Sequence, residues 1–221
     1  MRNIVAINTS PRKQGTSAML LGRLKHHLDM RGDRVHILHL YSNLNHLQTI
    51  MSAVSTADTI VICGSCYWNT YSADTIKLLE DLSAQPEILQ GKNLYGIIQG
   101  GMPYTHTHVS GLNMLKMFSN KSGVTYQGGF VMGLGAMLDG QSLSKLPNGK
   151  KVERQLLIFF EHIHNGEKSP DSVYEKALLK IPGFALRIIA ALGNRQINKA
   201  LNAQGIDVRQ PSPYLDDHIG P

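Results

Sequence analysis

The sequence has few of the features that mark membrane, extracellular or nucleic-acid-binding proteins. It contains no run of about 18 apolar residues without charges, so we predict no membrane-spanning helix. It has only two cysteines, and its first predicted strand starts at Asn3 with no export signal before it, which together favour the cytoplasm. The formal net charge is +6, but the basic residues are scattered, so we expect no nucleic-acid partner. No spacing of histidines or cysteines predicts a metal site.

Two common phosphate-binding motifs are also missing from the first strand-to-helix connection. Residues 3–7 are apolar and rich in β-branched side chains, which predicts a buried strand, and apolar residues at helical spacing follow from Ala18. The connection at 8–17 lacks both the Gly-Lys-Ser/Thr of a Walker loop and the glycines of a dinucleotide-binding loop. It is rich in hydroxyl groups instead, which suits a terminal phosphate such as that of a mononucleotide.

The side chains of this connection favour an anion as ligand. Ser10, Thr16 and Ser17 can donate hydroxyl hydrogen bonds, and Arg12 adds a charged fork that suits phosphate. The first backbone N–H groups of the following helix have no partner within the helix and carry partial positive charge. The alternative is an ordinary loop in which Thr16 or Ser17 caps the helix.

Strand patterns alternate with helix patterns along the first part of the chain. After the first strand we predict strands at 34–40, 57–64, 94–98 and near 125–132, with helices at 44–54, 73–83 and 108–121. This alternation predicts an α/β fold with a doubly wound, five-stranded parallel sheet and helices on both faces. In such sheets ligands bind beyond the carboxyl ends of the strands, where the loops 8–17, 65–72 and 99–106 would meet.

The composition changes beyond residue 135. We predict one domain at 1–135, and at 136–221 a connecting loop and a C-terminal helical extension that packs on the same domain or on a dimer partner. The predicted elements are an irregular connection at 133–149, helices at 152–164, 172–180 and 184–201, and an irregular tail at 210–221. The helix at 184–201 could instead lie on a membrane surface. Packing is favoured because Gly193 and Asn194 interrupt its apolar face.

The second and third loops contain residues suited to a flat ligand. Tyr67 and the only tryptophan, Trp68, lie in the second loop, where they could stack on an aromatic ring or, alternatively, cover the hydrophobic core. In the third loop Gly100 and Gly101 would let the backbone approach a planar group, or simply form a turn.

Three stretches together resemble the flavodoxin-like NAD(P)H-dependent FMN reductases and the related quinone and azo reductases. They are Ser10-Pro11-Arg12 with Gly15 and Ser17, the run from Tyr67 to Ala73 followed by Ile76-Lys77 and Glu80-Asp81, and Gly100-Gly101. The resemblance covers roughly residues 1–135 and departs from the family pattern at Ser65, where a proline is usual. It implies a flavodoxin-like fold, FMN as cofactor and NAD(P)H as co-substrate.

The resemblance also implies which residues hold FMN. They are Ser10, Arg12, Thr16 and Ser17 at the phosphate, Tyr67, Trp68, Asn69 and Thr70 at the ring and ribityl chain, and Gly100, Gly101 and Tyr104 on the other side of the ring. Tyr104 and His106 are candidates for proton delivery to a reduced acceptor.

The expected activity is electron transfer from NAD(P)H to a small-molecule acceptor such as a quinone, free flavin, azo or nitro compound, in a homodimer or homotetramer. One alternative is a one-electron carrier, which the basic charge disfavours because such carriers are strongly acidic. Another is a protein that keeps the fold without binding flavin. Cys63 and Cys66 could form a redox dithiol, but we favour a purely structural Cys63. Two cysteines cannot supply the four ligands of an iron–sulfur cluster.

Overall fold

The computed structural model describes residues 1–179 and 181–206, and it divides the chain into two units. The first is a compact unit, Met1–Leu179, built around one sheet. The second unit begins at Lys180 and contains a single long helix among its described residues. The tail predicted at 210–221 lies outside the described residues.

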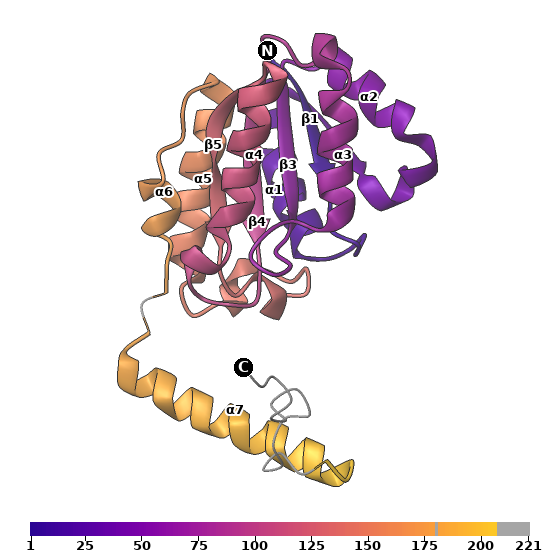
Figure 1. Cartoon of the computed structure of the whole chain (residues 1–221). Coiled ribbons are helices and arrows are strands. Elements are labelled where there is room, and N and C mark those ends of the chain that lie inside the picture. Colours follow the sequence, from indigo (N-terminus) through magenta and orange to yellow (C-terminus); the bar gives the residue numbers. More distant parts are fainter. Residues whose placement is uncertain (180, 207–221) are drawn as a thin grey trace, which may run out of the picture. The chain divides into compact units, whose positions relative to one another are not determined.

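The compact unit contains a five-stranded parallel sheet in the order β2-β1-β3-β4-β5 (Figure 1). The strands are β1 Asn3–Asn8, β2 Arg34–His39, β3 Thr59–Ser65, β4 Asn93–Gln99 and β5 Thr125–Met132. All four strand pairs are parallel, with Ile7 of β1 beside Ile62 of β3 and Ile62 beside Gly96 of β4. The predicted doubly wound, flavodoxin-like sheet is confirmed, and the middle residues of β3 and β4 are mostly apolar and buried because both faces of these strands are covered.

Helices cover both faces of the sheet. They are α1 Thr16–Asp29, α2 Leu47–Thr56, α3 Ala73–Ser83, α4 Val109–Ser122, α5 Gly149–Asn165 and the short α6 Ser172–Glu175. Single 3₁₀ turns lie at Leu40–Ser42, Leu44–His46, Pro86–Ile88, Thr105–Thr107, Gly135–Met137 and Leu143–Lys145. In Figure 1, α3 and α4 lie in front of the sheet, and α1 and α5 lie behind it.

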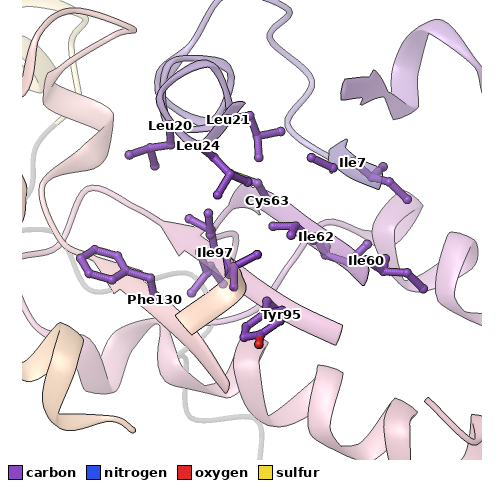
Figure 2. Packing of buried hydrophobic residues seen from close by; sticks show 14 of the residues in the cluster. Ile7, Leu20, Leu21, Leu24, Ile60, Ile62, Cys63, Tyr95, Ile97 and Phe130 are labelled. Atoms are coloured by element: carbon purple, nitrogen blue, oxygen red, sulfur yellow. The ribbon is translucent and has the colours of Figure 1, made fainter. Parts of the chain in front are cut away.

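The core fills the space between the sheet and these helices. Figure 2 shows Leu20 and Leu24 of α1 over Ile62 and Cys63 of β3, with Phe130 of β5 farther along the sheet. These side chains are fully buried or nearly so. The apolar positions that predicted the strands and helices are therefore the positions that hold the layers together.

The part of the chain beyond residue 135 divides at Leu179. Residues 136–179 belong to the compact unit, because α5 packs beside α1 and against β5. The helix expected at 172–180 is α-helical only over Ser172–Glu175. The carbonyl of Ala177 accepts a hydrogen bond from Asn148 Nδ2 at 2.6 Å instead of serving a longer helix.

The second unit contains the helix predicted at 184–201, which the structure places at α7 Gly183–Ala203. Its apolar side chains at Phe184, Ile188, Leu192 and Ile197 are all more than half exposed. Among the described residues, no helix is both long enough and apolar enough to cross a membrane.

Candidate functional site

The three loops that the sequence singled out meet at the carboxyl edge of the sheet. They line a cavity of about 230 Å³, here called the edge cavity, with residues from 10–16, 65–67 and 99–101. A fourth segment, 136–139, which the sequence did not indicate, completes the lining. Hollows of about 440 Å³ and 660 Å³ lie elsewhere on the compact unit, but residues of these three loops line neither of them.

The first loop is held in place by hydrogen bonds from several segments. The backbone N–H of Ser10 donates to Asn8 Oδ1 at 3.0 Å, and the ring of His39 on β2 lies with Nε2 2.9 Å from the Ser10 carbonyl. The loop ends at Gly15, which precedes α1 without any side-chain cap. The first N–H groups of α1 are therefore left for a ligand at the point where Gly15 and Thr16 line the cavity.

The side chains expected to bind phosphate differ in their availability. Ser10 is buried and lines the cavity, whereas Ser17 is fully buried and does not line it. Arg12 is exposed, with Nη1 2.5 Å from Asp139 Oδ1. Thr16 behaves differently from the expectation, because its hydroxyl donates to the Gly135 carbonyl at 2.7 Å and accepts from the Gly140 N–H at 3.3 Å. Its hydroxyl hydrogen is thus used within the protein, so Thr16 would have to bind a phosphate through its backbone N–H.

The second loop exposes the rings of Tyr67 and Trp68 and buries that of Tyr71. Tyr67 and Thr70 are joined by two backbone hydrogen bonds of 2.6 and 3.1 Å, which close a tight turn. The two residues between them have left-handed backbone, with φ of 47° at Trp68 and 69° at Asn69. Trp68 is fully exposed and Tyr67 is 45% exposed, so neither covers the core. Tyr71 is the buried aromatic residue of this loop, and its hydroxyl donates to the Ile97 carbonyl at 3.0 Å.

The two glycines of the third loop have different roles. A Cβ at Gly100 would lie 2.6 Å from the ring of buried His108, so this glycine is required by packing. A Cβ at Gly101 would meet nothing closer than the Ala136 side chain at 3.7 Å, which leaves this backbone open to the cavity. Tyr104 and His106 stack on each other with ring centroids 5.5 Å apart, and neither lines the edge cavity.

Comparison with known proteins identifies the family. A family model described as NADPH-dependent FMN reductase matches residues 2–133, which is more than half of the chain. The chain belongs to this family. It is therefore an oxidoreductase that uses FMN and takes electrons from NAD(P)H. No curated protein matches the sequence.

Solved structures with the same fold include flavin reductases and flavodoxins. An NADH:FMN oxidoreductase in its apo form is 23% identical, with a TM-score of 0.61 over 79% of this chain and 94% of that one. A putative quinone reductase from Klebsiella pneumoniae is 12% identical, with a TM-score of 0.53 over 74% and 84%. A Streptococcus pneumoniae flavodoxin is 16% identical, with a TM-score of 0.54 over 74% and 99%. At these identities the structures support the fold alone.

The edge cavity of this FMN reductase family member has the donors that FMN needs. The uncapped start of α1 and the guanidinium of Arg12 lie at one end, where a phosphate would find backbone N–H groups and a positive charge. The open backbone of Gly101 and the ring of Tyr67, which both line the cavity, offer surfaces for a flat ring system. Trp68, Asn69 and Thr70 lie in the same turn as Tyr67 but do not line the cavity. The residues present therefore fit the cofactor that the family implies.

The sequence analysis did not name Gln99, which lines the edge cavity and forms hydrogen bonds there. Gln99, the last residue of β4, donates from Nε2 to Ser65 Oγ at 2.8 Å and lies 3.4 Å from Ser17 Oγ. Its Oε1 is buried without a hydrogen-bond partner. The available signal was a polar side chain at the last position of an otherwise apolar strand.

The two cysteines are both free thiols, at the end of β3 and just after it. Burial raises the pKa of the Cys63 thiol far above its ordinary value, although its contact with Ser17 opposes the shift. Burial also raises the pKa of the Cys66 thiol. Both groups are therefore protonated at neutral pH, and neither has the thiolate character of a reactive dithiol.

Proposed function

We propose that this protein transfers electrons from NAD(P)H through FMN in the edge cavity to a quinone, free flavin, azo or nitro compound. The observation that carries the proposal is the uncapped start of α1 beside Arg12 in a cavity at the carboxyl edge of a doubly wound sheet. The residues assigned to FMN are Ser10, Arg12, Thr16, Ser17, Tyr67, Trp68, Asn69, Thr70, Gly100 and Gly101.

FMN supplies the redox chemistry, because its ring accepts a hydride from a nicotinamide and passes electrons on. The protein's part is to bind and orient. In this proposal loop 8–17 holds the phosphate through Arg12 and backbone N–H groups, while Tyr67 and Trp68 flank the ring. Tyr104 and His106 remain the candidates for proton delivery in this proposal, because they follow Gly100 and Gly101 in the same loop, although neither of them lines the cavity itself.

The phosphate assignment is tested by comparing FMN with riboflavin, which lacks the phosphate. A charge-assisted hydrogen bond contributes about 1.5–3 kcal/mol, so Arg12→Ala should weaken FMN binding by about tenfold to a hundredfold. Riboflavin binding should be almost unchanged by this substitution. Trp68→Ala should weaken both flavins alike, because it removes a contact with the ring.

Titrations followed by flavin fluorescence give the four affinities. Equal losses of FMN and riboflavin in Arg12→Ala would show that loop 8–17 does not hold the phosphate. Steady-state oxidation of NADH and NADPH with menadione as acceptor tests the activity itself. A protein that binds FMN but turns over neither nicotinamide would be an electron carrier instead.

We further propose that the protein is a homodimer or homotetramer in which a second copy covers α7. The support is the exposed apolar surface of this helix, which a monomer rarely retains. In the full chain, Ile188→Asp with Leu192→Asp should reduce the oligomer size measured by light scattering. The matched control, Asn194→Asp with Asn198→Asp, adds the same charges to polar positions of the same helix and should leave the size unchanged. An unchanged size in the first variant would contradict the proposal.

A further inference from the structure

The fourth segment of the edge cavity places a carboxylate at the site assigned to phosphate. Asp139 lines the cavity, and its Oδ1 lies 2.5 Å from Arg12 Nη1. The Arg12 side chain is 72% exposed and the Asp139 side chain 64%, so an ion pair of this kind adds little to the stability of the fold. Its position therefore suggests a role in binding.

The backbone holds Asp139 at this position. Asp139 itself has a left-handed conformation with φ of 45°, which is uncommon outside glycine, and Gly140 follows with φ of 82°. The Gly140 N–H donates to Thr16 Oγ1 at 3.3 Å. A Cβ at Gly140 would lie 3.3 Å from the Gln14 carbonyl oxygen, so this segment rests directly against the start of α1. The turn thus fixes a negative charge beside the anion-binding end of the helix.

We propose that Asp139 lowers the affinity for FMN by competing with its phosphate for Arg12. The carboxylate already occupies the guanidinium, and a phosphate that arrives must share it and tolerate a neighbouring negative charge. Riboflavin carries no phosphate and is not subject to this competition. The inference rests on the proposed phosphate site, and it assigns to Asp139 the control of how strongly that site distinguishes the two flavins.

Asp139→Asn tests the inference with the least structural change. Asparagine has the same shape, tolerates left-handed backbone and removes only the charge. From the usual size of an exposed ion pair, FMN should bind about two- to fivefold more tightly and dissociate correspondingly more slowly in low salt. Riboflavin affinity should stay the same, and the gain for FMN should shrink in about 1 M salt, where charges are screened within a few ångströms.

A matched control is available at the far end of α1. Asp29 is the last residue of α1 and pairs with Lys25 at 2.9 Å, so Asp29→Asn makes the same change in another exposed ion pair. It lies about 20 Å from the start of α1, given a rise of 1.5 Å per residue, and should leave both affinities unchanged.

The outcomes separate this inference from the proposed function. If Arg12→Ala weakens FMN selectively but Asp139→Asn leaves FMN unchanged or weakens it, the phosphate site stands and the competition by Asp139 is wrong. If Arg12→Ala weakens FMN and riboflavin binding equally, the proposed phosphate site is wrong. A gain for FMN in Asp29→Asn equal to that in Asp139→Asn would reduce the effect to net charge and would also overturn the inference.

Discussion

The loops on the two sides of the edge cavity are built in opposite ways. Loop 8–17 is tied to β2 through His39 and to the segment 135–140 through Thr16, so its backbone is fixed before any ligand arrives. Loop 65–72 is anchored at its ends, by Cys66 N–H to the Gln99 carbonyl and by buried Tyr71, but its tip exposes Trp68 completely. The difference matches the two kinds of recognition, because hydrogen bonds to a phosphate require fixed donors, whereas stacking requires only an available ring face.

The largest effect on stability is expected for a substitution at Gly64, which lies between the two loops. A Cβ at Gly64 would lie 2.3 Å from Thr9 Oγ1 of the first loop and 2.9 Å from the Tyr71 ring of the second. All three residues are buried, so neither neighbour can move into solvent. Gly64→Ala should lower the free energy of unfolding by about 1–3 kcal/mol, measured by urea denaturation. A variant as stable as the parent protein would show that the loops adjust independently.

A smaller effect is expected from the anchor of the first loop alone. His39→Ala removes the ring that lies 2.9 Å from the Ser10 carbonyl. Because a neutral hydrogen bond contributes about 0.5–1.5 kcal/mol, FMN affinity should fall by about two- to tenfold. Fluorescence titration measures the affinities for FMN and, as a comparison, for riboflavin. An equal loss for riboflavin would mean that His39 supports the whole cavity and not only the end proposed to bind phosphate.

The second loop should show the opposite relation between stability and binding. Trp68 has a strained left-handed backbone, whereas asparagine is favoured at this position of such a turn. Trp68→Asn should therefore raise the free energy of unfolding by about 0.5–1 kcal/mol while weakening both flavins. Urea denaturation measures the stability of this variant, and fluorescence titration measures its affinities for the two flavins. A loss of stability would mean that the exposed ring contributes to folding after all.

The smallest effect is expected at the cysteines. Cys63→Ala, Cys66→Ala and the double variant should retain most turnover, because both thiol pKa values are raised and the thiolate is scarce at neutral pH. Alkylation by iodoacetamide should be slow at pH 7 and should accelerate only as the pH rises toward those pKa values. Loss of turnover with flavin still bound would instead indicate a working dithiol.

The fold and the three loops were predictable because their signals are local. The apolar run of β3 and the helical spacing of α3 are properties of consecutive residues, and the order of elements follows from them. The partners of Thr16 and Arg12 were not predictable, because Gly135 and Asp139 lie more than a hundred residues farther along the chain. The Asp139-Gly140 pair is typical of a turn with left-handed backbone, but no local pattern shows that this turn lies beside Arg12. The role of His39 likewise depends on how β2 pairs with β1.

The hydrogen bonds of Thr16 also have a consequence for how the protein is made. Thr16 leaves the ribosome well before its partners Gly135 and Gly140, which follow 119 and 124 residues later. A nascent chain that already contains Arg12 and the start of α1 still lacks the segment that closes over them. Because chains emerge from the N-terminus and their units fold as they are completed, we expect the proposed phosphate site to bind FMN only once synthesis has passed residue 140.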